Sequence, residues 1–437
     1  MKYKMLKNAQ TKYFHGNGIF ASIMTGMTQE FFTPFMLLIG GTARHVAFLN
    51  AIPNICAALA QLKSPELSER SGSRKRISVI FLLLQALALV PLIGLAIFQI
   101  NNPFALIMLV VLFVVSGAVV TPPLGSLLAD FVQSKERGAF FGWRNKVMGI
   151  VTVSASLCGG FILFFMKNIN VYYGFMSLFV CAFIARISSI YFLSKVEEKP
   201  QENKKEHYFS FKQFVSRYKQ SNFAQFVFFA ALMSFSVNLA SPYFSVYMLR
   251  NLGFGYLHYT VITAAATITI FYFMKRWGSY ADRVGNLKVI QATAPLIGLI
   301  PALWLISSNS IYLIIIQVFS GFVWAGYNLC ISNFIYDAVM PEKRVRCIAY
   351  FNLINGLAVS TGALTGGYLL LWLPATLGQT ILTLFIISSV LRLAVGYFVP
   401  RKLKEVRTVE SVESVELFFQ IIGMRAIPGV ERKTIRY

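Results

Sequence analysis

The sequence predicts an all-α membrane protein of twelve transmembrane helices, arranged as two pseudo-symmetric bundles of six. Three observations predict this fold: an apolar composition, about twelve apolar runs of spanning length, and an internal repeat. Of the 437 residues, 56% are hydrophobic and 13% are charged, which is too apolar for a soluble globular protein of this size. Aromatic residues make up 15% of the chain and include forty phenylalanines, as expected for lipid-facing helices.

Each predicted span is a run of about 20 apolar residues, the length that crosses the hydrocarbon core of a bilayer. The runs centre near residues 28, 54, 88, 114, 154, 182, 233, 268, 298, 322, 358 and 388. We expect a first bundle over 1–195, a cytoplasmic linker over 196–221, a second bundle over 222–400 and a cytoplasmic tail over 401–437. In the linker, Phe211, Phe214, Val215 and Tyr218 fall on one helical face, which predicts an amphipathic helix at the membrane surface.

The N-terminal segment is basic and precedes the first apolar run, so a cleaved signal peptide is the competing interpretation. The run over 18–40 is long for a signal peptide, and no small-residue cleavage site follows it. A retained first helix is therefore favoured.

The distribution of basic residues predicts the orientation in the membrane. With the N-terminus inside, the predicted inner segments carry thirty-five lysines and arginines, whereas the outer loops carry three: Arg44, Lys167 and Arg250. This bias places both termini in the cytoplasm. It also explains the formal charge of +23 without a nucleic-acid partner. We expect a multi-pass protein of the plasma membrane, with a bacterial cytoplasmic membrane the favoured location.

The chain contains an internal repeat at offsets of 206 to 213 residues. DFVQSKERGAFFGWRNKVMG, which begins at Asp130, matches DAVMPEKRVRCIAYFNLING, which begins at Asp337. Further matches are Arg137 with Arg344, Gly159-Gly160 with Gly366-Gly367, Arg186 with Arg392, and Pro34 with Pro242. Because six spans bring the chain back to the same side, the halves are parallel repeats, an arrangement associated with transporters.

These features resemble the major facilitator superfamily (MFS) of transporters over residues 14 to 400. The most specific element is Gly278-x-x-x-Asp282-Arg283-x-Gly285, which is similar to the cytoplasmic-loop signature of the family. The first-half copy keeps Glu69, Arg70 and Gly72 but has Pro65 in place of the glycine. The resemblance implies that these loops latch the two halves together on the cytoplasmic side, with a carboxylate meeting a helix N-terminus or an arginine. We include Asp130, Arg137, Asp337 and Arg344 in this predicted latch.

A second signature of the family, a glycine-rich fifth helix, marks its proton-driven exporters. The fifth span has Gly142 and Gly159-Gly160, but Ala155-Ser156 stands where those exporters have Gly-Pro. This departure weakens the case for an antiporter.

Glu30 lies in the middle of the first apolar run, MTGMTQEFFTPFM. A charged carboxylate without a partner costs several kcal/mol there. Gln29 and Glu30 fall on one helical face with Ser22, Gly26 and Thr33, and the resemblance places the first and seventh helices around a central cavity. We therefore predict that Glu30 is a proton-coupling residue. The alternatives are a hydrogen-bonded structural glutamate and direct capture of a cationic substrate.

The other cavity candidates are polar residues inside the predicted spans: Gln29, Asn50, Asn54, Asn238, Tyr327, Asn328 and Asn355. Asn238 corresponds to Glu30 at an offset of 208. For each residue, interhelical hydrogen bonding is the commoner explanation, and contact with substrate is the alternative.

Arg186 and Arg392 lie well inside apolar runs, and each is nine residues from the next cation. An arginine spans part of that distance by extending towards the interface. The resemblance places the sixth and twelfth helices at the periphery, so we favour structural roles, with Asp130 or Asp337 as partners, over substrate binding.

Together these features predict a secondary active transporter that moves a small organic solute by alternating access with proton coupling, as a permease or an exporter. There is no GxxxxGK[ST], HExxH or GxSxG motif, which argues against ATP drive and against an enzyme. The alternatives are a lipid or amphiphile flippase of the same fold, and a non-transporting sensor or receptor that kept the fold. We expect a monomer that binds a small molecule, protons and the lipid bilayer, with no cofactor and no metal.

Overall fold

The computed structural model describes residues 9–131, 137–198, 211–216, 218–339, 341–376 and 378–406. This part of the chain is helical and has no β-strand. The first half contains α1 (Ala9–Thr28), the 3-10 turn η1 (Gln29–Phe31), α2 (Phe32–Leu38), α3 (Ala43–Ser71), α4 (Arg74–Ile97), α5 (Pro103–Asp130), α6 (Arg137–Met166) and α7 (Val171–Ser194).

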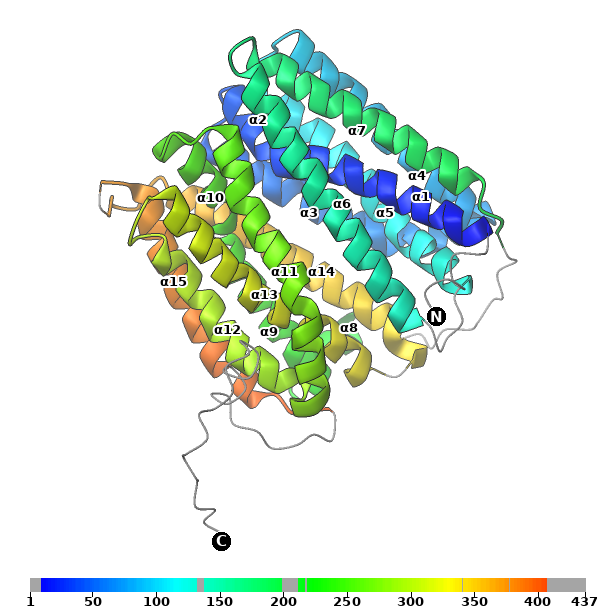
Figure 1. The fold of residues 1–437 in the computed structure, drawn as a ribbon. Coiled ribbons are helices and arrows are strands. Elements are labelled where there is room, and N and C mark those ends of the chain that lie inside the picture. The colour runs from blue at the N-terminus through cyan, green and yellow to red at the C-terminus, as the bar shows by residue number, and fades with distance from the viewer. Residues whose placement is uncertain are drawn as a thin grey trace, which may run out of the picture.

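The second half repeats the pattern after the short linker helix α8 (Phe211–Ser216). It contains α9 (Asn222–Asn238), α10 (Ser241–Val246), the π-helical turn η2 (Tyr247–Asn251), α11 (Tyr256–Val284), α12 (Asn286–Leu303), α13 (Ser310–Ala338), α14 (Pro341–Leu369), α15 (Thr380–Phe398) and η3 (Pro400–Lys402). Figure 1 shows the two halves as neighbouring groups of long helices.

Eleven stretches of the described chain are long and apolar enough to cross a membrane. They correspond to the second to twelfth predicted spans. The first predicted span, which is divided into α1, η1 and α2, is not among them. The seventh is also broken, between α9 and α10, but it qualifies as one stretch over Asn222–Asn251.

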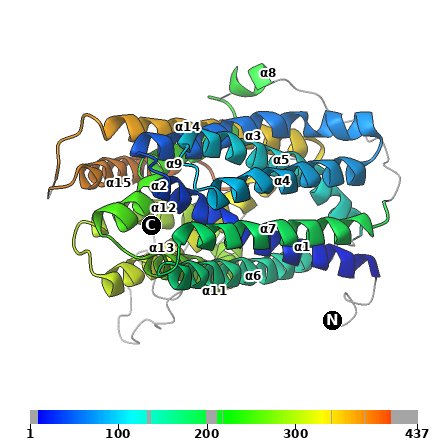
Figure 2. The ribbon, with the colours of Figure 1, turned by 90° about the horizontal axis from the view of Figure 1, so that it is seen from above.

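The halves meet through two pairs of helices that the repeat relates to each other. α3 packs against α14, and α6 packs against α11. Figure 2 shows these pairs at opposite sides of the molecule. The halves also touch where α2 meets α10, at the end of the bundles where Figure 1 shows the two groups close together. The interface thus follows the pseudo-symmetry of the sequence.

Glycines at repeat-related positions permit this close packing. Gly160 on α6 faces Thr260 of α11, and its counterpart Gly367 on α14 faces Ala47 of α3. A Cβ at either position would overlap the partner helix. Small residues at such contacts let helix backbones approach closely within a membrane.

The other glycine of each pair packs inside its own half. Gly159 faces the ring of Phe31, whereas Gly366 faces the Leu239 carbonyl and the ring of Tyr243. The Tyr243 hydroxyl donates to the carbonyl of Ala363 at 2.8 Å. In each Gly-Gly pair, therefore, one glycine packs within its own half and the other packs against the opposite half.

The linker helix α8 is shorter than the predicted amphipathic segment. Phe214 is buried, and its ring centroid lies 5.5 Å from that of Tyr350 on α14. Phe211, Val215 and Tyr218 are exposed. Residues 407–437 of the predicted tail lie outside the described residues.

We predict that Gly366→Leu destabilises the second half. The added side chain would overlap the backbone carbonyl of Leu239, and overpacking of this kind costs about 1–3 kcal/mol of unfolding free energy. The measurement is the melting temperature of the purified protein in detergent. Gly94→Leu is the matched control, because the space beside Gly94 on α4 is open. Equal melting temperatures for the two variants would contradict the assigned contact.

Candidate functional site

The first span breaks directly before Glu30. The Thr28 hydroxyl donates to the Met24 carbonyl at 2.8 Å, and α1 ends at Thr28. Pro34 has no N–H, so the carbonyl of Glu30 lacks its α-helical donor. The Tyr259 hydroxyl of α11 donates to that carbonyl at 3.1 Å. This hydrogen bond attaches the broken segment of the first half to the second half.

Glu30 faces a cavity of about 300 Å³ whose wall otherwise comes from the second half. Its side chain is exposed although it lies between the two bundles, because it opens onto this space. The wall residues are Glu30, Val237, Ser241, Phe244, Ser245, Met248, Tyr259, Thr263, Ala266, Ile300, Trp304, Gln317, Ser320, Trp324 and Arg392. Hydroxyls, aromatic rings and one charge of each sign therefore share a single pocket.

The Glu30 carboxylate makes no hydrogen bond or ion pair within the described chain. The one contact recorded for this residue is the bond to its main-chain carbonyl from Tyr259. The Tyr259 hydroxyl also lies 3.3 Å from the Ser245 hydroxyl. The carboxylate is thus available to a proton or a ligand in the cavity.

Arg392 is held at the broken end of the seventh span. Its Nη2 donates to the Val237 carbonyl at 2.9 Å, and its Nε donates to the Ser388 hydroxyl at 2.9 Å. The Ser236 carbonyl lies 3.5 Å from the same Nε. Because these carbonyls belong to the last turn of α9, the negative end of the helix dipole stabilises the guanidinium.

The predicted pairing of Arg392 with Asp337 is wrong. All the polar contacts recorded for Arg392 go to the end of α9 and to Ser388, while Asp337 accepts a hydrogen bond from Asn286 at 2.7 Å. Arg392 also lines the cavity, although its helix was expected at the periphery. At the break in the seventh span before Pro242, main-chain carbonyls accept the hydrogen bonds of Arg392 in place of the predicted carboxylate.

Arg186, the repeat counterpart of Arg392, has different surroundings. It is 5% exposed, and its Nη2 lies 3.8 Å from the Met24 sulfur. Its Nε has no hydrogen-bond partner in the described structure. Arg186 is not part of the cavity wall, and no carboxylate pairs with it among the described residues.

The predicted asparagines do not line this cavity. Asn50, Asn54 and Asn238 donate to carbonyls of the preceding turns of their own helices, at 2.9, 2.6 and 2.9 Å. Asn355 accepts from the Ser234 hydroxyl at 2.6 Å, a contact that ties α14 to α9. In this conformation these residues fit the structural explanation.

The remaining candidates are also absent from the cavity wall. Tyr327 is buried with its ring 5.5 Å from that of Trp324. Gln29 and Asn328 are exposed but do not line this pocket. Gln317 lines the cavity but was not predicted, although it is a polar side chain within the apolar run IYLIIIQVFSGF.

Two predicted latch residues of the second half, Gly285 and Asp337, meet other residues of the same half at the start of α12. Gly285 has φ of 90°, a conformation that favours glycine, and a Cβ there would overlap the Glu405 carboxylate. Glu405 accepts from the backbone N–H of Leu287 at 2.7 Å. Asp337 is joined to Asn286 in the same turn. The predicted residues Gly285 and Asp337 thus lie together, with Glu405 as a partner that the sequence analysis missed.

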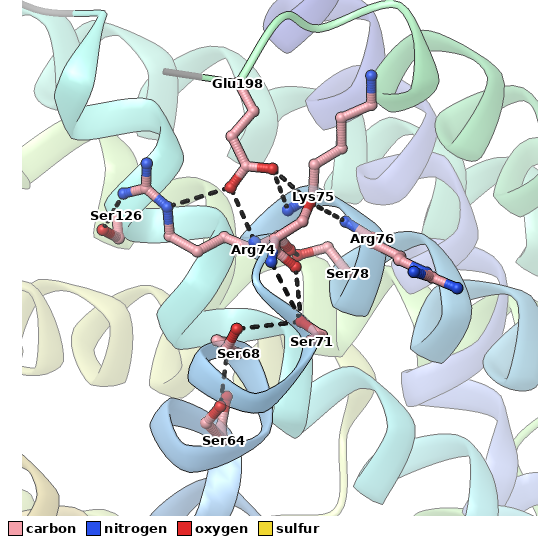
Figure 3. Close-up of polar contacts among 10 residues, drawn as sticks. Ser64, Ser68, Ser71, Arg74, Lys75, Arg76, Ser78, Ser126 and Glu198 are labelled. Atoms are coloured by element: carbon pink, nitrogen blue, oxygen red, sulfur yellow. Dashed lines mark hydrogen bonds and ion pairs between the residues drawn. The ribbon is translucent and has the colours of Figure 1, made fainter. Parts of the chain in front are cut away.

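The first half has an equivalent cluster at the start of α4, shown in Figure 3. Ser73 accepts from the backbone N–H of Arg76 at 3.0 Å and donates its hydroxyl to Glu198. Glu198 accepts from the backbone N–H groups of Arg74 and Lys75 at 2.8 and 3.4 Å, and it pairs with Arg74 Nε at 3.4 Å. We call this arrangement the Glu198 cap; it satisfies donors that a helix leaves open at its N-terminus.

The two capping glutamates are repeat partners, because Glu405 follows Glu198 by 207 positions. Val196 and Leu403, two residues before them, are both buried. The shared offset is the signal from which the sequence alone would have found both caps.

The other predicted latch residues are Glu69, Arg70, Gly72, Asp130, Arg137, Gly278, Asp282, Arg283 and Arg344. Gly72 follows α3 with φ of 66°; Arg70, Asp282 and Arg283 are exposed. A Cβ on Gly278 would make an ordinary 3.5 Å contact with Leu329. The side chains of Glu69, Asp130, Arg137 and Arg344 lie outside the described structure.

A larger hollow of about 630 Å³ adjoins the Glu198 cap and is lined by Lys75, Arg76 and Ser194 among others. It is an open surface hollow beside a structural cap. We therefore place the candidate site at the smaller cavity, where both halves contribute polar groups.

The chain belongs to the Major Facilitator Superfamily. The family model matches residues 18–290 and again residues 226–429. The two matches begin 208 positions apart, in agreement with the repeat. The chain is therefore a multi-pass membrane protein of a transporter family.

Solved structures of transporters share the fold at low sequence identity. A point mutant of the nucleoside transporter NupG is 13% identical with a TM-score of 0.72, covering 91% of this chain and 100% of that one. A D-xylose-proton symporter is 12% identical with a TM-score of 0.70, covering 90% and 97%. A bacterial homologue of the iron transporter ferroportin, in an inward-facing state, is 14% identical with a TM-score of 0.68, covering 91% and 100%. No curated protein sequence matches the chain.

The Glu198 cap predicts a pH-dependent contribution to stability. Burial by itself raises the pKa of the Glu198 carboxyl, but hydrogen bonds from Ser73, Arg74 and Lys75 outweigh it and hold the pKa below the ordinary value of 4.5. A carboxyl whose pKa is lowered by folding stabilises the folded state above its ordinary pKa. That stabilisation is lost as the pH falls through the lowered value.

We predict that Glu198→Gln lowers the unfolding free energy by about 1 kcal/mol at pH 7, the usual scale of a helix cap. The difference from the parent protein should persist at pH 5 and shrink below pH 4.5. Melting temperatures in detergent across this range test it. Glu66→Gln on α3 is the control, because Glu66 is exposed. A difference that is as large at pH 3.5 as at pH 7 would count against the ionised cap.

Proposed function

We propose that the protein is a secondary active transporter that moves a small organic solute by alternating access, with Glu30 as the proton-coupling group. The observation that carries the proposal is the Glu30 carboxylate, which opens without a protein partner onto a cavity built largely by the other half. An acid inside a span that neither pairs with a cation nor accepts a hydrogen bond is costly. Reversible protonation gives such a group a role.

The arrangement of the halves supports alternating access. They touch through two symmetry-related helix pairs and through the broken segments near Glu30. Rigid halves joined in this way can rock about a site between them. In such a motion the Glu30 carboxyl would meet water on one side of the membrane and then on the other, and it would bind or release a proton as its surroundings change.

Membership of the family supports transport, and the D-xylose-proton symporter is a relative in fold that is named for proton coupling. The basic segments favour cytoplasmic termini in a plasma membrane.

We predict that Glu30→Gln abolishes solute accumulation driven by a pH gradient while sparing exchange of labelled for unlabelled solute. An amide keeps the shape of the side chain but cannot carry the proton. The measurement is flux in proteoliposomes, with a solute first found by thermal shift across a ligand panel. Glu66→Gln serves as the matched control outside the cavity.

Accumulation by Glu30→Gln at the rate of the parent protein would remove the coupling role. Absence of any flux by the parent protein, with a ligand that binds, would instead favour the sensor or receptor alternative.

A further inference from the structure

The cavity presents one acidic and one basic side chain that come from opposite halves and are not paired with each other. Glu30 comes from η1 and Arg392 from α15. We propose that the transported solute is an organic anion, an aromatic or apolar carboxylate, whose carboxylate binds Arg392 while Glu30 carries the co-transported proton. This assignment rests on the proposed function and specifies its substrate class.

Arg392 has donors left for a ligand. Nε and Nη2 are used by the end of α9 and by Ser388, but Nη1 has no acceptor in the described chain. The residue is 2% exposed and lines the cavity. A guanidinium fixed on one side is well placed to bind a carboxylate on the other through charge-assisted hydrogen bonds.

The rest of the wall suits a flat apolar body. Phe244 and Trp304 pack with ring centroids 4.8 Å apart, and Trp324 lies on the same wall. The indole N–H of Trp304 is buried without an acceptor in the described part of the chain. A volume of about 300 Å³ is at the small end of ligand pockets. These features fit a single-ring solute with one polar end.

The two charges link solute binding to protonation. When Glu30 is ionised, its field opposes the entry of an anion into the cavity. When Glu30 is protonated, the positive charge of Arg392 is uncompensated and attracts the anion. By linkage, the bound anion strengthens proton binding by the same factor. The loaded protein then carries proton and anion together, and the empty one carries neither.

Other titratable groups near Glu30 do not supply this linkage. Tyr259 lines the cavity, but its hydroxyl is bound to the Glu30 carbonyl. Arg250, in η2, donates to the carbonyl of Gly41 at 2.6 Å. The hydroxyl of Tyr243 on α10 donates to the Ala363 carbonyl of α14.

The repeat argues that the cavity position of Arg392 is specific. Its counterpart Arg186 lies against Met24 and away from the cavity. A purely structural arginine required by the fold would keep the same surroundings in both halves. The divergence leaves a single anion site, matched by a single carboxylate.

The test is equilibrium binding of radiolabelled phenylacetate to the purified full-length protein at pH 8 and pH 5.5, where this probe stays ionised. We expect the parent protein to bind about tenfold more tightly at pH 5.5, within the usual range of coupling between sites. Glu30→Gln mimics the protonated state and should bind tightly at both values. Glu66→Gln should behave as the parent protein does.

Variants of Arg392 test the anion site itself. Arg392→Gln should weaken binding by about tenfold or more, the scale of a charge-assisted hydrogen bond. Arg392→Lys keeps the charge but lacks the guanidinium, so it should bind more tightly than Arg392→Gln and less tightly than the parent protein. Because loss of contacts to α9 can destabilise these variants, their melting temperatures are measured alongside. The pH response of the parent protein and of Glu30→Gln needs no change at Arg392.

Three results overturn the proposal: no phenylacetate binding by the parent protein, affinity that does not change with pH, or preference for phenylacetamide, phenylethylamine or phenylalanine over phenylacetate. In each case solute flux that depends on Glu30 would leave the proposed function standing. Normal phenylacetate binding without any flux in proteoliposomes would instead overturn transport and leave the anion site intact.

Discussion

The site depends on the hydrogen bond from the Tyr259 hydroxyl to the carbonyl of Glu30. Pro34 leaves that carbonyl without a helical donor, and in a membrane an unsatisfied carbonyl is costly. The partner therefore has to come from another helix, and here it comes from the other half. This bond fixes the break in the first span beside the cavity, and it places an acidic side chain where the second half supplies most of the wall.

The repeat has been kept where it serves the framework and has diverged where it forms the cavity. Glu198 and Glu405 cap α4 and α12 in the same way, and Gly160 and Gly367 occupy equivalent places between the halves. By contrast, Glu30 corresponds to Asn238, and of the repeat-related pair Arg186 and Arg392 only Arg392 lines the pocket. Asymmetry of this kind is expected of a site that binds one solute, which has no reason to match a two-fold axis.

Much of the fold was predictable, because the spans, the loops and the repeat can be recognised from the residue types along short stretches of the sequence. The site was less so. The polar residues on one face of the first span drew attention to Glu30. The amides of Asn50 and Asn54, however, donate to main-chain carbonyls of their own helix α3, and residue spacing alone does not reveal this. Arg392 was assigned a carboxylate partner because the sequence shows charges and does not show the free carbonyls at a helix break. Gln317 and Trp304 could be recognised as wall residues only from the three-dimensional structure, in which they line one cavity with Phe244 and Ser245.

The most direct test of the central claim, that position 30 opens onto a wet cavity, is chemical labelling. Glu30→Cys in a background without the five native cysteines would be treated with a charged, water-soluble thiol reagent. Ser245→Cys on the cavity wall and Met233→Cys in the core serve as references. The structure predicts that positions 30 and 245 react at comparable rates, far faster than position 233. Reaction at position 30 as slow as at position 233, with position 245 reactive, would contradict it.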